Sequence, residues 1–108
     1  MIKIIYKTIK EKNIEIIPKV KKGCWIHIEE PTSKEIKFIT NTFNLDKEIL
    51  IDALDPFEVP RYEKEENNIY ILTRYSTKDT NSNNTSTFLM VIHPDYFITI
   101  SKQKVSFL

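Results

Sequence analysis

Residues 31–55 read PTSKEIKFITNTFNLDKEILIDALD, and this stretch decides the fold because it predicts two consecutive helices among strand-like segments. Thr32 and Glu35 have the spacing of a capping box, in which each side chain accepts a hydrogen bond from the other residue's backbone N–H. The apolar residues that follow recur with the spacing of one helix face: Ile36, Ile39 and Phe43. The pattern therefore predicts a helix that begins after Thr32 and ends at Asn44.

The second half of the stretch predicts a shorter helix over about residues 47–54. Asp46 can cap its N-terminus, because its side-chain oxygen can accept a hydrogen bond from a free backbone N–H. Pro56 stops the helix, since the residue before a proline avoids the helical region. The buried face would consist of Ile49, Leu50, Ala53 and Leu54.

The segments on both sides of this stretch have the alternation or the apolar content of strands. They are residues 2–6, 14–17 and 24–28 before it, and 62–65, 69–75, 88–92 and 96–101 after it. We expect residues 62–75 to form a hairpin that turns at 66–68, and the polar stretch 76–85 to form a mobile loop. With no internal repeat and no domain linker, residues 1–108 are expected to form a single domain of strands and helices.

The composition excludes several classes of protein. The single Gly makes a phosphate-binding glycine loop untenable, and the single Cys, Cys24, cannot form an internal disulfide. Residues 24–67 carry eleven acidic and five basic side chains, a net charge of −6, which argues against nucleic acid and suits a cation. No stretch approaches the roughly 20 apolar residues of a membrane helix, so the chain as given is expected to be soluble.

The sequence offers no catalytic or cofactor-binding constellation. Cys24 and His27 are three positions apart on a predicted strand, so they would point to opposite faces and could not form a nucleophile–base pair. Ser33 and Ser76 have no nearby histidine, and His93 precedes a proline in a predicted turn. We therefore expect that the protein is not an enzyme.

Three carboxylates on the second predicted helix are the candidate metal ligands. Glu48, Asp52 and Asp55 are spaced i, i+4 and i+7, on the side opposite the apolar face. Oxygen-rich surfaces suit magnesium or calcium, and negative charge near a helix C-terminus is unfavourable unless something compensates it. The pattern predicts a weak cation site that needs a further carboxylate, for example from another subunit. The alternative is a solvated acidic face.

Several segments together resemble the N-terminal cytosolic domain of the CorA family of divalent-cation channels. The matching segments, in chain order, are WIHI at 25–28, PTSKE at 31–35, FNLD at 43–46, ILIDALD at 49–55, VPRYE at 59–63, IYILTR at 69–74 and the strands at 88–92 and 96–101. Their order and spacing cover some three-quarters of the chain. The resemblance implies a mixed α/β fold of α+β character, with helices packed on a mixed sheet. It also implies the regulatory domain of a magnesium and cobalt channel-transporter.

The resemblance also implies partners and a location. The parent protein would be a homopentamer, anchored at the cytoplasmic face of the plasma (inner) membrane by pore helices that these 108 residues lack. In the family, metal held between neighbouring cytosolic domains keeps the channel closed, and the acidic residue matching Asp52 supplies one ligand. Some members carry a further acidic residue directly before it, where this chain has Ile51. Magnesium, with cobalt as a further candidate, is the cation implied.

Two further expectations concern the C-terminal end of the chain and an alternative function. The apolar residues Phe107 and Leu108 indicate a chain cut within a longer protein, because natural termini are more often polar. The alternative function is a freestanding protein-interaction domain that uses the same fold. The two functions differ in whether apolar, membrane-spanning segments follow Leu108 in the gene.

Overall fold

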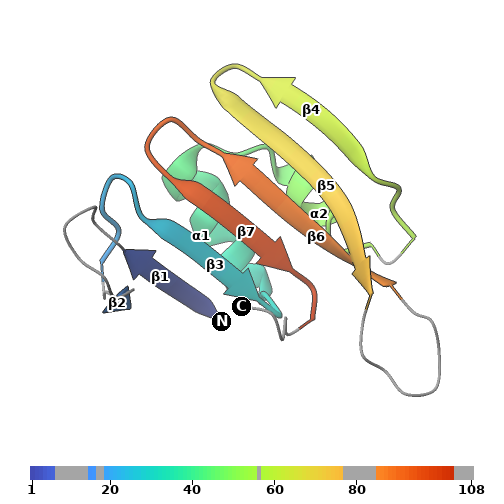
Figure 1. Cartoon of the computed structure of the whole chain (residues 1–108), viewed down its shortest axis with the longest axis horizontal. Coiled ribbons are helices and arrows are strands. Elements are labelled where there is room, and N and C mark those ends of the chain that lie inside the picture. The colour runs from blue at the N-terminus through green and yellow to red at the C-terminus, as the bar shows by residue number, and fades with distance from the viewer. Residues whose placement is uncertain (7–14, 17–18, 56, 77–84, 104–108) are drawn as a thin grey trace.

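The computed structural model describes residues 1–6, 15–16, 19–55, 57–76 and 85–103. In this part of the chain, seven strands and two helices follow one another (Figure 1). They are β1 (Ile2–Tyr6), β2 (Glu15–Ile16), β3 (Trp25–Glu29), α1 (Ser33–Phe43), α2 (Lys47–Asp52), β4 (Arg61–Glu65), β5 (Asn68–Ser76), β6 (Thr85–Ile92) and β7 (Phe97–Ser101). The predicted strands and helices are thus confirmed, and in the described part of the chain their boundaries shift by at most three residues. The predicted loop falls mainly on residues 77–84, outside the described ranges.

The strands form one sheet in the order β2-β1-β3-β7-β6-β5-β4. β3 pairs with β7 in parallel, and every other pair is antiparallel, so the sheet is mixed as predicted. β4 and β5 form the expected hairpin, and its turn places Glu66 at φ 51°. The sheet therefore runs from the short β2 at one edge to the charged strand β4 at the other.

Local capping chemistry sets the helix boundaries. Thr32 and Glu35 form the predicted capping box, and Asn44 ends α1 in the left-handed conformation at φ 53°. The Asp46 carboxylate accepts hydrogen bonds from the backbone N–H groups of Glu48 and Ile49. α2 ends at Asp52, earlier than the predicted residue 54, because the backbone N–H groups of Leu54 and Asp55 bond to carbonyls three residues back, as at a tightened helix end.

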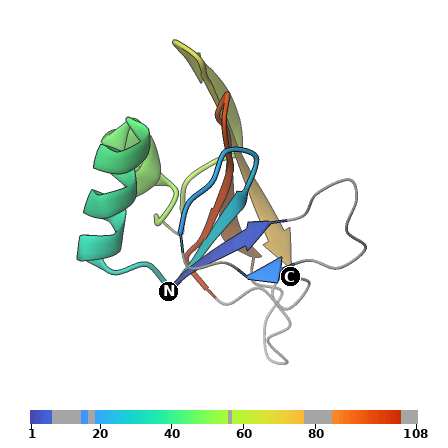
Figure 2. The ribbon, with the colours of Figure 1, turned by 90° about the vertical axis from the view of Figure 1, so that its left-hand side faces the viewer.

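Both helices lie on the same side of the sheet (Figure 2). Their apolar faces and the helix-facing side of the central strands form one core, in which Ile39, Leu50 and Ile98 are fully buried. The predicted face of α1 is buried completely; on α2 Ile49, Leu50 and Ala53 are buried, and Leu54 packs partly buried against them. The Thr87 hydroxyl donates to the carbonyl oxygen of Ala53, which ties the end of α2 to β6.

The other face of β3 and β7 carries a buried polar network. Trp25 Nε1 donates to Thr99 Oγ1 at 2.8 Å, and His27 Nδ1 lies 2.7 Å from the same oxygen. His27 Nε2 lies 3.0 Å from Glu29 Oε1. All of these contacts are satisfied when Thr99 donates to Nδ1 and the neutral imidazole donates from Nε2. One threonine hydroxyl therefore serves two side chains of the neighbouring strand.

Replacing Thr99 with valine should lower the free energy of unfolding by about 1–3 kcal/mol, because valine keeps the shape but leaves Nδ1 of buried His27 and Nε1 of Trp25 without their partner. Urea denaturation measures the change. The control Thr99→Ser keeps the hydroxyl and should lose clearly less. No loss of stability in Thr99→Val would show that the fold does not require these hydrogen bonds.

Candidate functional site

The three predicted metal ligands do not form one stripe. Glu48 is exposed in the first turn of α2, Asp52 is its last residue, and Asp55 lies beyond it. The spacing argument required a helix through residue 55, so the expected stripe is wrong in its last member. In the described ranges, no three His, Cys, Asp or Glu side chains gather into a group that could hold a metal ion. The role of these residues as ligands to a shared ion stays a prediction.

Asp52 is bound by a guanidinium. Arg61 Nη2, at the start of β4, donates to Asp52 Oδ2 at 2.6 Å, and the two side chains are 29% and 39% exposed. The hydrogen bond that Arg61 donates to Asp52 is the largest cause that raises the pKa of Arg61 above its usual value. The negative charge at the C-terminus of α2 therefore has a local counter-charge, contrary to the expectation that it lacked one.

Arg61 also approaches two other carboxylates. Its Nη1 donates to Glu58 Oε1 at 3.4 Å, and its Nε lies 3.5 Å from Glu63 Oε1. Sequence reasoning did not single out Arg61, although it is the only basic residue between Glu48 and Glu63. The isolated position of Arg61 among acidic residues was the feature of the sequence that could have identified it.

Asp55 serves the turn that follows α2. Its Oδ1 accepts a hydrogen bond from the backbone N–H of Phe57 at 2.9 Å, a local bond that aspartate commonly makes in turns. Asp55 is therefore held by the backbone and Asp52 by Arg61, while Glu48 and Asp55 are both exposed and Asp52 is partly buried. As hard oxygen donors all three fit a magnesium-type ion chemically, but each would be at most one ligand of a larger set.

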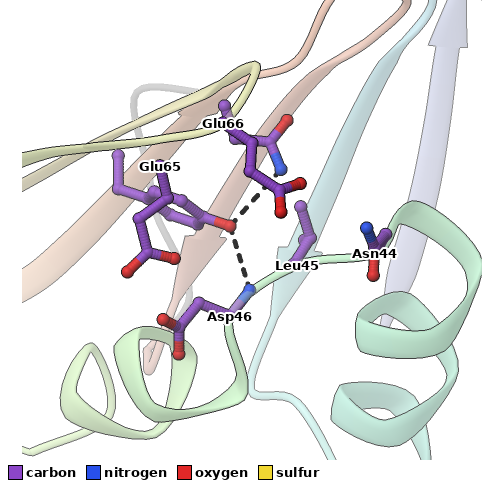
Figure 3. Close-up of a pocket in the computed structure, with 7 residues that line it drawn as sticks. Asn44, Leu45, Asp46, Glu65 and Glu66 are labelled. Atoms are coloured by element: carbon purple, nitrogen blue, oxygen red, sulfur yellow. Dashed lines mark hydrogen bonds between the residues drawn. The ribbon is translucent and has the colours of Figure 1, made fainter.

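A second acidic surface lies at the other end of α2, where the β4–β5 turn approaches the α1–α2 link (Figure 3). An open cavity of about 470 Å³ is lined there by Asn44, Leu45, Asp46, Glu65, Glu66, Asn68 and Tyr70. The buried Tyr70 hydroxyl accepts a hydrogen bond from the backbone N–H of Asp46 at 2.9 Å. This bond fixes the start of α2 against β5.

Two carboxyl groups oppose each other in this cavity. The hydrogen bond with the Asp46 carboxyl is the largest cause that raises the pKa of Glu65 above its usual value of 4.5, and the charges of Asp46, Glu63 and Glu66 add to it. Asp46 was predicted only as a helix cap, and its proximity to Glu65 depends on the pairing of β4 with β5. Their repulsion when both are ionised is a cost that protonation, or a cation, would relieve.

Neither helix in the described part of the chain has the length and apolar content needed to cross a membrane.

Comparison with protein families matches residues 20–108 to the family described as CorA-like Mg²⁺ transporter protein. A search of curated proteins finds no match.

Solved structures share the fold at low sequence identity. The complete CorA magnesium transporter of Methanocaldococcus jannaschii is 18% identical, with a TM-score of 0.79, 97% of this chain covered and 33% of that chain. The soluble domain of the same transporter is 19% identical, with a TM-score of 0.79 and coverage of 97% and 42%. The ZntB cytoplasmic domain of Vibrio parahaemolyticus RIMD 2210633 is 10% identical, with a TM-score of 0.70 and coverage of 95% and 44%.

These likenesses confirm the predicted fold class: a mixed sheet with helices, matching the fold of that soluble domain. The chain spans less than half the length of each of these structures.

The Asp46–Glu65 pair gives the protein a testable pH dependence. Because the folded-state pKa of Glu65 is raised, the folded protein binds this proton more tightly than the unfolded chain, so the pair's effect on stability worsens as pH rises above 4.5. Glu65→Gln should therefore raise the melting temperature at neutral pH and flatten its fall with pH. Thermal denaturation across this pH range measures both effects.

The matched control is Glu48→Gln, which removes an exposed carboxylate from the first turn of α2, where negative charge is favourable. This control should show no gain in melting temperature. A gain of the same size in both variants would point to the overall acidity of the region instead of the Asp46–Glu65 pair.

Proposed function

Because the chain belongs to the family of CorA-like Mg²⁺ transporter proteins, we propose that it is the N-terminal regulatory domain of a divalent-cation channel. The observation that carries this proposal is a family match that covers residues 20–108, and with them both helices and five strands of the described sheet. A magnesium transporter and its soluble domain share the fold. The pore would be formed by parts of a longer protein outside these residues.

We propose that Asp52 supplies one ligand of a regulatory cation site between neighbouring subunits, with Glu48 and Asp55 beside it. A bound divalent cation would supply the positive charge that offsets repulsion between carboxylates of adjacent domains. Asp52 suits this role because its carboxylate is 39% exposed at the end of a helix whose other face is anchored in the core. One domain offers only part of the coordination sphere, so the site would be weak without a second subunit.

Exposed apolar side chains support a subunit contact near Asp52. Ile51, Phe57 and Val59 are 51%, 88% and 64% exposed, and they fall in the segment that runs from α2 to β4. Such side chains are typical of surfaces that another protein covers. A homopentameric parent protein, held at the cytoplasmic face of the plasma (inner) membrane through its pore, would bury them between copies.

The same observation also supports the second candidate function, a freestanding domain that binds another protein through this surface. Neither candidate function involves catalysis. They are separated by the gene sequence after Leu108: two apolar runs of about 20 residues would be expected for the channel.

The proposed role of Asp52 can be tested in the longer channel protein. Asp52→Asn should raise the Mg²⁺ concentration that closes the channel by about tenfold, which corresponds to the loss of about 1.4 kcal/mol of binding free energy. Transport assays at graded internal Mg²⁺ measure the shift.

The control Asp95→Asn removes a carboxylate from the β6–β7 turn, away from α2, and should leave the Mg²⁺ dependence unchanged. An unaltered dependence in Asp52→Asn would rule out the proposed ligand role.

A further inference from the structure

Arg61 is surrounded by more negative charge than it can neutralise. Three carboxylates approach its guanidinium: Asp52 at 2.6 Å, Glu58 at 3.4 Å and Glu63 at 3.5 Å. With all four groups ionised, three negative charges and one positive charge leave a net charge of −2, which the nearby guanidinium of Arg74 reduces to −1. A divalent cation would offset the remaining negative charge.

The three carboxylates belong to different parts of the fold. Asp52 ends α2, Glu58 lies in the link to β4, and Glu63 is two residues after Arg61 on β4 itself. Glu58 is held in place from the sheet, because Arg74 Nη1 on β5 donates to its carbonyl oxygen at 2.9 Å. The guanidinium therefore contacts one carboxylate of the helix and two that follow it along the chain, Glu58 and Glu63, which form the strand-side pair.

The contacts of Arg61 with the strand-side pair are not fully formed. The bond to Glu58 is long, and Arg61 Nε has no hydrogen-bond partner among the described residues, although it lies 3.5 Å from Glu63 Oε1. Hydrogen bonds between charged groups are usually about 2.7–2.9 Å. If the guanidinium left Asp52, shorter contacts to Glu58 and Glu63 would give Arg61 a second position in which its charge is paired.

We propose that Arg61 is an internal counter-ion that competes with a divalent cation for Asp52 and retreats to Glu58 and Glu63 when the cation binds. This inference rests on the proposed function, since it names the regulation of the same carboxylate. In the absence of cation Arg61 holds Asp52 and stabilises the end of α2. When Asp52 takes a cation, the strand-side carboxylates keep the guanidinium paired.

The exposure of the pair makes such an exchange feasible. Ion pairs as exposed as Asp52 and Arg61 are screened by water and contribute little net stability, so they are easily broken. A divalent cation carries twice the charge of the guanidinium. The two pairings of Asp52 therefore differ little in free energy, and the cation concentration can decide which partner Asp52 has.

The test uses Mn²⁺ as the probe and the 108-residue chain. Mn²⁺ broadens the NMR signals of backbone amides near its binding site, so a titration reports both the affinity and the place. Arg61→Gln should broaden the amides at the end of α2 at about fivefold lower Mn²⁺ than the unchanged chain. Adding Asp52→Asn to Arg61→Gln should abolish that gain.

The matched control is Lys64→Gln, which removes the same charge from the same strand. Lys64 pairs with Ile69 of β5 and directly follows Glu63 on β4. Because successive side chains of a strand point to opposite faces, the side chain of Lys64 lies on the face opposite those of Arg61 and Glu63. This control should not change the Mn²⁺ concentration needed at α2. Melting temperatures show that each variant is folded at the temperature of the titration.

Three outcomes would overturn the inference. They are no gain in Arg61→Gln, an equal gain in Lys64→Gln, and a gain that persists without the Asp52 carboxylate, for example one located at Asp46 and Glu65. None of these outcomes bears on the gating test in the longer protein. Asp52 could bind a cation there without competition from Arg61, so failure of this inference is distinguishable from failure of the proposed function.

Discussion

The parallel pairing of β3 with β7 is the constraint on which the rest of the structure depends. Neighbouring parallel strands cannot be joined by a tight turn and need a long crossover connection. Here the crossover contains both helices and the antiparallel strands β4, β5 and β6 (Figure 1). The chain leaves β3, covers one face of the sheet with α1 and α2, and re-enters the sheet at its far edge. The link from α2 to β4 therefore spans from the helical layer to the sheet edge, and both acidic surfaces lie along α2 and its approach to β4.

Local chemistry explains why the helices and most strands could be predicted. Thr32, Asn44 and Asp46 act through hydrogen bonds to backbone groups a few residues away, so the sequence contains both partners. Pairing between distant strands has no such local signal. The sequence could not predict that Thr99 completes the hydrogen bonds of Trp25 and His27, because that contact depends on the β3–β7 register. The family resemblance supplied the overall fold class, which the local patterns alone left open.

The candidate site, too, was predicted only where its signals are local in the sequence. The spacing of Glu48, Asp52 and Asp55 and the unfavourable negative charge near a helix C-terminus singled out all three carboxylates, and the family resemblance selected Asp52 among them. The partner of Asp52 is Arg61, nine positions later, and its contact with Asp52 requires that β4 return beside α2. The helix was predicted two residues too long, because the i→i+3 bonds that tighten its end leave no pattern in the side chains. This error placed Asp55 on a stripe that the structure does not contain.

The shortness of α2 gives the charge at Asp52 its importance. A six-residue helix is too short to be stable by its own hydrogen bonds, so its packing and its ends must hold it. The Asp46 side chain caps its start, and the Asp46 backbone N–H donates a hydrogen bond to the Tyr70 hydroxyl. At the other end, the carbonyl oxygen of Ala53 accepts a hydrogen bond from the Thr87 hydroxyl on β6. Asp52 lies directly before Ala53, between the helix and that link to the sheet. A change of partner at Asp52 therefore acts where the helical layer is joined to the central strands, and its mechanical effect need not stay local.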